Sequence, residues 1–570
     1  MTGDALVTRI ADCTNASSCN TIVSVPNVPS RRARTGRVTK KKSVPLREGV
    51  LQRAENGIRR HWVLLLILTI GIAIRTWEFG SFPPGLNQDE ASTGYDAWSV
   101  LHYGIDRNGF RFPMMFVSWG SGMYALSGYL AWPFMLIGGL NVITVRMPHL
   151  VLGILSIVAV YGLALRCIDR KFALIAAFFL AINPWHIMVS RWGLDSNVFP
   201  GLFLIAVLLL TASLKKQKLL PLAAVFFALC TYTYGTAYVI VPVFLVLSGL
   251  ALRRWWKFSS ATLMLSGGIV TALCMPMLLY IFINQFHGTS IELPFLSIPR
   301  MTGPARFQTV STVYGGQWYD LWRNLTILWD LLLRQDDGLG WNRILPYGTL
   351  YPIGLPFALL GIFSAIGTVK KSAGKHPLLF PLLWILCCIV LSLFQRVNIN
   401  RINIIFIPLV FFTAYGVYAA TKTSKVALAG IVSVFFLFFT QFAPAYFVHF
   451  SGKAREDFFV GLPDAIAAAS EATEKPICVT EGANMPYIYA LFAEELPPHE
   501  FVNTAVVTNP GNQFQFVSHF GRYTFGLSRC TEKTYGAYVL NSREERHLYE
   551  SDQYRIVDFT DYAVAFPVAS

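Results

Sequence analysis

Long apolar runs, separated by short polar segments, dominate the chain from residue 62 to residue 447. A membrane-spanning helix needs roughly 17–25 apolar residues, and twelve runs come near this length. Eleven of them are predicted to cross the membrane: 62–79, 147–165, 172–189, 198–213, 219–231, 238–252, 261–283, 348–369, 378–394, 402–420 and 426–447. Glycines and Pro133 interrupt the twelfth, 122–140, which is typical of an interfacial or re-entrant helix packed on protein.

Positive charge fixes the predicted sidedness of these runs. If 122–140 also crossed, five consecutive basic clusters would lie outside: 166–171, 215–218, 253–257, 370–375 and 421–425. Cytoplasmic loops are the ones that carry excess Lys and Arg. We therefore expect eleven crossings, with the N-terminus in the cytoplasm and the C-terminus outside the cell membrane.

Three regions follow from this arrangement. Residues 1–60 are predicted to be a disordered basic cytoplasmic tail, because they are rich in Ser, Thr, Asn and Arg. Residues 61–447 form the membrane domain, whose first external loop is 80–146. In 448–570, strand patterns at 477–481, 537–541 and 554–568 alternate with helix patterns, one of them at 543–551, which predicts a small extracytoplasmic α/β domain. The predicted fold class is a polytopic α-helical membrane protein with this domain at its C-terminal end.

Composition agrees with that class. Of the 570 residues, 54% are hydrophobic and only 14% are charged, with a mean hydropathy of +0.48. The net charge of +15 lies largely in the tail and in short loops between apolar runs, which indicates topology and membrane lipid contact and excludes nucleic acid as the expected partner. Cys478 and Cys530 form the single cysteine pair of the C-terminal region and would be able to form a disulfide outside the cytosol.

Two adjacent acids, Asp89 and Glu90, follow the first apolar run within the stretch GLNQDEASTGYDAW. Acids in the first turn of a helix interact favourably with its positive end, so both are consistent with simple capping. A carboxylate beside an apolar wall also has the properties of a general base, because desolvation raises its pKa. Both interpretations stay open at this stage.

External arginines are unexpected under the charge rule, and two segments carry them. Arg191 and Asp195 lie in SRWGLDSN (190–197), where Trp192 indicates an interfacial anchor as the alternative to a binding role. Arg396 and Arg401 bracket QRVNINR (395–401) together with Asn400. An arginine fork beside amide groups suits a phosphate at the membrane surface, although lipid anchoring or an ion pair with an acid explains it too.

An aromatic segment, TYTYGTAY (231–238), contains Tyr234. It is typical of the aromatic belt of a membrane protein, and stacking on a sugar is the alternative function. Asp336 and Asp337 lie in a predicted turn, and two acids alone give only a weak indication of a divalent metal site. No cofactor is expected with any certainty, and no metal ligands are assigned.

The order and sidedness of these motifs resemble the polyprenyl-phosphate-sugar-dependent glycosyltransferases of the C superfamily (GT-C). The plan looks like the protein O-mannosyltransferase and aminoarabinose transferase types (families 39 and 83). The acidic pair follows the first span, and RMPHLVLGILSIVAVYGLALR (146–166) precedes NPWHIMVSR (183–191). The resemblance implies that Asp89, with its neighbour Glu90, is catalytic and that Asp195 is the second external acid.

The resemblance also has departures. The middle external loop, 284–347, is too short for the β-trefoil of protein O-mannosyltransferases, and FVSWGSGMY (116–124) lacks the Lys that contacts the lipid phosphate in aminoarabinose transferases. Phosphate contact would then fall to Arg191, Arg396 or Arg401.

The implied function is transfer of a sugar from a polyprenyl-phosphate carrier in the membrane to an extracytoplasmic glycan, lipid or protein. The resemblance implies a hexosyl- or pentosyltransferase, and the expected location is the plasma membrane. A lipid-linked sugar transporter or flippase is the alternative, and it predicts charged or broken helices near the bilayer centre. A non-catalytic scaffold is a further alternative.

Overall fold

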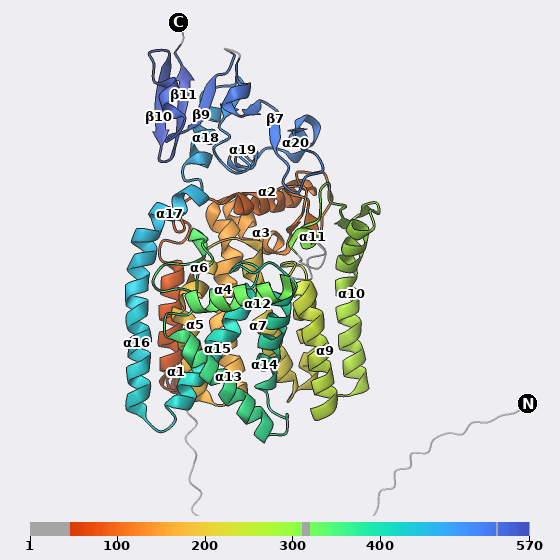
Figure 1. Ribbon diagram of the computed structural model, residues 1–570, viewed down its shortest axis with the longest axis vertical. Coiled ribbons are helices and arrows are strands. Elements are labelled where there is room, and N and C mark those ends of the chain that lie inside the picture. The colour runs from red at the N-terminus through yellow and green to blue at the C-terminus, as the bar shows by residue number, and fades with distance from the viewer. Residues whose placement is uncertain (1–45, 311–319, 532–533, 569–570) are drawn as a thin grey trace, which may run out of the picture. The chain divides into compact units, whose positions relative to one another are not determined.

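The computed structural model describes residues 46–310, 320–531 and 534–568. The chain divides into two compact units, Met1–Arg60 and His61–Ser570. Residues 1–45, most of the predicted cytoplasmic tail, lie outside the described residues. The second unit holds both the apolar helices and the C-terminal sheet (Figure 1).

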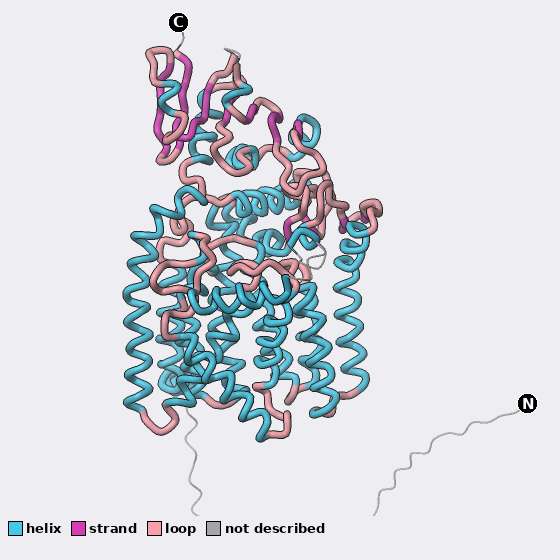
Figure 2. The backbone as a smooth tube through the Cα atoms, in the orientation of Figure 1, coloured by secondary structure: helices cyan, strands magenta, loops and turns pink. Residues whose placement is uncertain are grey.

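Seven described helical segments are long and apolar enough to cross a membrane. They are Val142–Cys167 (α4), Asp195–Ser213 (η1 and α7, Val198–Ser213), Ala237–Trp255 (α9), Ser260–Gln285 (α10), Gly354–Lys371 (α13), Asn403–Ala420 (η4 and α15, Phe406–Ala420) and Lys425–Val448 (containing α16, Lys425–Pro444). Figure 2 shows these helices side by side below the strands. The predicted class, a polytopic helical membrane protein with a C-terminal sheet domain, is confirmed.

Four predicted runs form shorter helices. Three of them are the His61–Thr76 part of α1 (Leu46–Thr76), α8 (Leu220–Cys230) and α14 (Leu379–Leu393). The fourth, 172–189, is two helices rather than one: α5 (Arg170–Ile182) and α6 (Pro184–Val189). The chain breaks at Asn183 because the residue before a proline disfavours helical backbone, and the Asn183 side chain then accepts from the His186 N–H to cap α6.

Close helix packing in the membrane region depends on two glycines. Gly361 of α13 and Gly416 of α15 face each other, and a Cβ on either would collide with a backbone carbonyl, of Phe412 or Phe357 respectively. Small residues at a membrane-helix interface let the backbones approach, which increases van der Waals contact. This pair therefore fixes the distance between α13 and α15.

The first external loop contains two helices, α2 (Gln88–Tyr103) and α3 (Leu126–Gly138). Asn87 caps α2: its side chain accepts from the Asp89 N–H, and the Glu90 side chain accepts from the Asn87 N–H. The α3 helix, which lies in the run 122–140, packs on α2, and the Trp132 indole donates to the Ala97 carbonyl across 2.8 Å. This contact agrees with the prediction that the run 122–140 packs on protein.

The C-terminal region contains a mixed seven-stranded sheet of order β10-β11-β9-β5-β8-β7-β6. Its strands are β5 (Ile477–Val479), β6 (Val506–Val507), β7 (Val517–Phe520), β8 (Tyr523–Phe525), β9 (Ala537–Asn541), β10 (Tyr554–Phe559) and β11 (Tyr562–Pro567). β5 pairs in parallel with β8 and β9, and the other pairs are antiparallel. Helices α17 (Phe450–Asp457), α18 (Leu462–Ala472), α19 (Tyr487–Glu494) and α20 (Pro498–Thr504) accompany it. The helix predicted over 543–551 is only a short 3₁₀ turn, η7 (Arg546–Tyr549).

The smaller elements connect these parts. They are β1 (Met115–Phe116), β2 (Met123–Tyr124), β3 (Ile291–Leu293), β4 (Leu296–Ile298), α11 (Arg306–Val310), α12 (Asp320–Arg334) and the 3₁₀ turns η2 (Gln217–Leu219), η3 (Gly340–Asn342) and η6 (Leu527–Arg529). β1 pairs with β2 and β3 with β4, both antiparallel.

The first external loop and the C-terminal domain share one hydrophobic core. Buried side chains of α2 and α3, such as Tyr95 and Ala131, belong to the same cluster as Ile466 of α18 and Ile488 of α19. Hydrogen bonds join the same parts: the Tyr95 hydroxyl donates to the Leu496 carbonyl at 2.6 Å. The C-terminal domain is therefore packed directly on the loop that carries the acidic pair.

Candidate active site

A polar cavity of about 340 Å³ opens between the membrane-domain loops and the C-terminal domain. Its lining residues are Asn87, Gln88, Asp89, Trp192, Leu194, Asp195, Tyr234, Arg306, Leu339, Trp341, Asn398, Asn400, Arg401, Asp457, Phe459 and Asn484. Five predicted site residues are in this set: Asp89, Asp195, Tyr234, Asn400 and Arg401. The structure thus brings together segments more than 300 residues apart in sequence.

Asp89 reaches this cavity from the first turn of α2. Its Oδ1 accepts a hydrogen bond from the Trp119 indole at 3.1 Å. Trp119 is buried, so this contact fixes one carboxylate oxygen while Asp89 itself lines the cavity. The helix N-terminus stabilises the negative charge of Asp89. An oriented carboxylate at a cavity wall has the placement that a general base requires.

Glu90 lies on the other side of the helix start and is fully buried. Its carboxylate pairs with Arg146 at 2.7 Å, and its Oε1 also accepts from the Gly193 N–H at 2.7 Å. Together with the bond from the Asn87 N–H, these contacts occupy both oxygens. Glu90 does not line the cavity, and its place is that of a structural charge which holds α2 to α4 and to the 190–197 segment.

Asp195 begins the turn η1 (Asp195–Asn197) and is buried at the cavity wall. Its Oδ1 accepts from the Ser196 N–H at 2.7 Å, and its Oδ2 accepts from the Tyr124 N–H at 3.5 Å. The second bond is long and therefore weak. Asp195 consequently brings a second carboxylate to the same cavity as Asp89.

Arg306, at the start of α11, is the cation that the sequence analysis missed. It lines the cavity with both acids. Burial by itself lowers the pKa of the Arg306 guanidinium, but the acidic groups around it, above all Tyr234 and Asp89, outweigh burial and raise that pKa. Arg306 lies in the external loop 284–347, so the charge rule that singled out Arg191 and Arg401 could have found it too.

Arg401 and Asn400 reach the cavity from the turn after α14. The Asn398 side chain accepts from the Arg401 N–H at 2.8 Å, and Asp337 accepts from the Ile399 N–H at 2.9 Å, so this turn is held from two sides. Arg396, which was predicted to act with Arg401, is exposed and does not line the cavity. Its contribution is a carbonyl that accepts from the Arg401 guanidinium at 3.2 Å.

Arg191 is buried and faces backbone rather than the cavity. Its guanidinium donates to the carbonyls of Arg75 at 2.7 Å and Glu78 at 3.1 Å, and to two further carbonyls of the same segment. These acceptors are the end of α1 and the turn that follows it. Arg191 therefore connects that turn to the 190–197 segment, whereas its neighbour Trp192 lines the cavity.

Further polar groups missed by the sequence analysis complete the wall. The indole N–H groups of Trp192 and Trp341 are buried and have no hydrogen-bond partner among the described residues. Asp457 lines the cavity, and its carbonyl accepts from the Asn87 side chain at 2.9 Å. Asn484 adds an amide from the C-terminal domain. Polar sugars and phosphates need such donors and acceptors in a site.

An apolar cavity of about 130 Å³ adjoins the polar one. Tyr234 and Arg306 line both, so the two cavities share a wall. The other residues of the apolar cavity come from β2, α11, the ends of α9 and α14 and the segments beside those two ends: Tyr124, Gly235, Thr236, Tyr238, Val239, Phe307, Leu391, Phe394 and Gln395. A ligand with a charged group and an apolar tail would match this pair of cavities.

The described residues offer few side chains that could bind a metal ion together. Among those residues, no three His, Cys, Asp or Glu side chains are placed so that they could hold a metal ion together. The cavity carboxylates Asp89 and Asp195 are accompanied by amides and guanidinium groups instead.

Comparison with known proteins gives the fold. A family model described as dolichyl-phosphate-mannose-protein mannosyltransferase matches residues 125–280, from the start of α3 into α10. ArnT from Cupriavidus metallidurans bound to undecaprenyl phosphate has 12% sequence identity over 90% of this chain and 99% of that chain, with a TM-score of 0.56. The chain has the GT-C fold. The apo state of the same ArnT matches with a TM-score of 0.54 and 12% identity, over 90% of this chain and 98% of that one.

A more distant similarity is to the oligosaccharyltransferase AglB from Archaeoglobus fulgidus, in complex with an inhibitory peptide and a dolichol-phosphate. It has 14% identity and a TM-score of 0.47, over 76% of this chain. The chain spans 64% of the length of that AglB chain. A search of curated proteins found no match.

Proposed function

We propose that this protein is a membrane glycosyltransferase that moves a sugar from a polyprenyl-phosphate carrier to an acceptor on the extracytoplasmic side. The observation that carries the proposal is the shared cavity of Asp89, Asp195, Arg306 and Arg401, which adjoins an apolar cavity through Tyr234 and Arg306. The family model and the fold of ArnT support the same class of chemistry.

The donor fits across the two cavities. A polyprenyl-phosphate sugar has an isoprenoid chain, a phosphate and a polar sugar in a row. The chain would lie against Tyr238, Phe307 and Leu391, and the phosphate would bind between Arg306 and Arg401. Guanidinium groups bind phosphate oxygens through charge-assisted, often bidentate, hydrogen bonds. The sugar then occupies the polar cavity beside the two carboxylates.

The proposed reaction needs one base and a stabilised leaving group. An acceptor hydroxyl gives its proton to Asp89, and its oxygen forms a bond to the anomeric carbon of the donor sugar. The bond between that carbon and the phosphate oxygen breaks, and its electron pair leaves with the polyprenyl phosphate. Arg306 and Arg401 stabilise the charge that develops on the phosphate. The indole of Trp119 keeps Asp89 oriented toward the attacking hydroxyl.

The proposal also places the C-terminal domain on the extracytoplasmic side of the membrane. Cys478 and Cys530 form a disulfide, and structural disulfides occur mainly in oxidising compartments outside the cytosol. This bond supports an extracytoplasmic C-terminal domain, and the domain packs on the loop with Asp89. The plasma membrane is the expected location, with the N-terminus in the cytoplasm.

The test compares Asp89→Asn with Asp464→Asn in purified protein. Asp464 is an exposed acid in the first turn of α18, so its replacement removes a similar helix-end charge away from the cavity. Each variant is incubated with membranes and radiolabelled polyprenyl-phosphate mannose, glucose and arabinose in separate reactions. The release of polyprenyl phosphate and the transfer of label are measured.

We expect at least one donor to be consumed by the unaltered protein and by Asp464→Asn. Loss of a general base typically lowers the rate by about 10²–10⁴-fold, and this is the loss expected for Asp89→Asn. Full activity of Asp89→Asn would remove Asp89 from the mechanism. Accumulation of intact donor on the opposite leaflet, without release of polyprenyl phosphate, would show a transporter instead.

A further inference from the structure

A third cavity, of about 310 Å³, lies within the C-terminal domain. Its lining residues are Glu481, Ala483, Pro486, Tyr487, Thr508, Phe516, Val517, Ser518, Phe525 and Arg529. They come from the segment after β5, from the start of α19, and from β6 to η6. None of these residues lines the polar cavity of the candidate active site. We define this set as the domain cavity.

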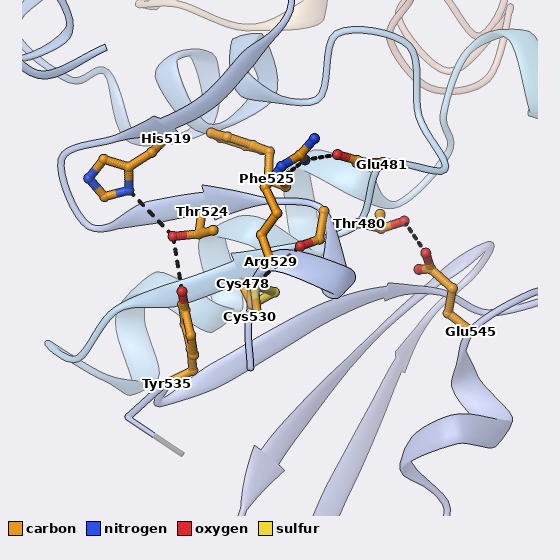
Figure 3. The surroundings of a disulfide bond; sticks show 11 residues. Cys478, Thr480, Glu481, His519, Thr524, Phe525, Arg529, Cys530, Tyr535 and Glu545 are labelled. Atoms are coloured by element: carbon orange, nitrogen blue, oxygen red, sulfur yellow. Dashed lines mark hydrogen bonds and ion pairs between the residues drawn. A yellow bond between two sulfur atoms is a disulfide. The ribbon is translucent and has the colours of Figure 1, made fainter. Parts of the chain in front are cut away.

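An ion pair forms the polar side of the domain cavity. Arg529 pairs with Glu481, and the Arg529 guanidinium also donates to the Phe525 carbonyl at 2.5 Å. Figure 3 shows this pair beside Phe525 and next to the disulfide. Gly526 makes the close approach feasible: its φ is +102°, and a Cβ there would collide with both charged side chains.

The disulfide ties the two segments that carry this ion pair. Cys478 is in β5, three residues before Glu481, and Cys530 directly follows Arg529. The cross-link therefore limits how far the carboxylate and the guanidinium can separate (Figure 3). The pair keeps charged donors and acceptors at the cavity wall, where a polar ligand can reach them.

Aromatic side chains form the other side. Phe516 lines the cavity and is 49% exposed, so part of its ring is accessible to a ligand. Tyr487 is buried, stacks on Phe501 and meets Trp119 edge-on. The Ser518 and Thr508 hydroxyls lie in the same wall. The cavity therefore combines an exposed aromatic face with hydroxyl, carboxylate and guanidinium groups.

Only one short segment separates the domain cavity from the candidate active site. In residues 482–487, Asn484 lines the polar cavity, whereas Ala483, Pro486 and Tyr487 line the domain cavity. Trp119 makes a second connection, because its indole binds Asp89 and its ring packs on Tyr487. Tyr487 and Trp119 thus form a chain of contacts from the domain cavity to the proposed catalytic base.

We propose that the domain cavity binds a neutral carbohydrate, namely the part of a glycan acceptor beyond the residue that receives the sugar. The apolar face of a sugar ring packs on the Phe516 ring, and its hydroxyls bond to Glu481 and Arg529. This assignment to an acceptor rests on the proposed glycosyltransferase function, whereas the binding of a neutral glycan does not.

Charge and shape favour a glycan over other ligands. Glu481 and Arg529 compensate each other, so the cavity has no surplus positive charge for a phosphate or another anion. A peptide is the competing macromolecule, because β6 is at the edge of the sheet and could pair with an added strand. The volume, the ion pair and the aromatic face suit a sugar ring better than a row of backbone groups.

The test measures binding without donor or transfer. Full-length protein in detergent is mixed with α-mannotriose, α-arabinotriose or maltotriose, and saturation-transfer difference NMR detects the bound sugar. Phe516→Ala is compared with Phe514→Ala, because Phe514 is similarly exposed (45%) in the same loop but does not line the cavity. Glu481→Gln and Asp89→Asn are the other variants, and an alanine-rich pentapeptide is the competitor.

We expect at least one trisaccharide to bind and Phe516→Ala to weaken that binding about tenfold. Phe514→Ala and Asp89→Asn should keep full affinity, and Glu481→Gln should lower it. Absence of binding by all three sugars, equal effects of the two phenylalanine variants, or displacement by the pentapeptide would overturn the proposal. If Asp89→Asn keeps binding while no donor is consumed by any variant, the glycan site stands and the proposed transfer reaction fails.

Discussion

Two neighbouring regions around the start of α2 handle charge in opposite ways. Beneath the helix, Glu90 and Arg146 form a buried pair, and Arg146 also donates to the carbonyls of Pro83 at 2.8 Å and Gly85 at 2.9 Å. On the cavity side, Asp89 and Arg306 face an open volume of about 340 Å³. In the first region protein groups enclose the charges completely, whereas in the second the charged groups also border a cavity with room for a ligand.

The difference shows how to separate structural charges from functional ones. Asp89 and Glu90 are adjacent in sequence, yet one residue of an α-helix turns the side chain by about 100°. Arg191 and Arg306 both lie in segments predicted to be external, but backbone carbonyls surround Arg191, whereas acidic side chains oppose Arg306. The charged side chains that border a cavity are therefore the ones that can bind a ligand or take part in a reaction.

The largest effect is expected from Glu90→Gln. The change leaves the Arg146 charge buried without its counter-ion, and breaking a buried pair in this way costs about 3–5 kcal/mol. Thermal unfolding of the purified protein in detergent should therefore begin at a clearly lower temperature, and Glu90→Gln/Arg146→Met should recover part of the loss. Asp89→Asn should leave the unfolding temperature nearly unchanged. A stable Glu90→Gln protein without transfer activity would instead assign Glu90 to catalysis.

A smaller effect is expected from Arg306→Met. Loss of one group that stabilises charge in the transition state typically lowers kcat by about 10²-fold. The unbranched side chain of Met preserves much of the packing made by the Arg306 side chain. Donor consumption is the measurement. Arg300→Met is the matched control, because Arg300 lies in the same external loop but is exposed and outside both cavities. Equal losses in the two variants would contradict a phosphate-binding role for Arg306.

The change over a single pH unit is expected to be the smallest effect, and it acts through another buried group of charges, in the loop 80–146. Burial raises the pKa of Asp106 from 3.8 to about 8 and that of Asp96 to about 6, with Arg107 beside them. Asp106 Oδ2 has no hydrogen-bond partner among the described residues, which agrees with a protonated carboxyl.

A raised pKa means that the folded protein binds the proton more tightly than the unfolded chain. The stabilisation is therefore complete below the unfolded pKa of 3.8 and is lost as pH rises through about 6 to 8. Each released proton costs at most about 1.4 kcal/mol per pH unit. The unfolding temperature measured from pH 5 to 9 should fall, and Asp106→Asn should flatten the curve. An unfolding temperature that rises over this range would contradict the protonated state.

Much of the fold follows from the sequence because apolar length and positive charge act locally. The membrane helices appear where the runs are, and the break at Asn183 is explained by the proline after it. The strands β5, β9, β10 and β11 lie where alternation predicts them. The shortened turn at η7 shows the limit of such patterns, since local sequence alone did not reveal that the helix would end after one turn.

The candidate site was harder to predict because its members meet through tertiary packing. Asp89, Asp195 and Arg401 could be found as polar groups at the ends of apolar runs. Arg306 and Asn484 belong to segments whose position depends on contacts far along the chain, such as the Arg306 N–H donating to the Ser121 carbonyl at 2.8 Å. The buried ion pair of Glu90 and Arg146 likewise could not be predicted, because it depends on the position of Arg146 in the folded protein.

The shared core of the first loop and the C-terminal domain has a consequence for biosynthesis. Residues 86–145 are translated well before residues 462–564, and ribosomes add about 5–20 residues per second. The apolar faces of Tyr95 and Ala131 therefore stay without their final neighbours for roughly 15 to 65 seconds. A nascent chain released early would expose that surface to chaperones and proteases, because the last helices and strands are needed to cover it.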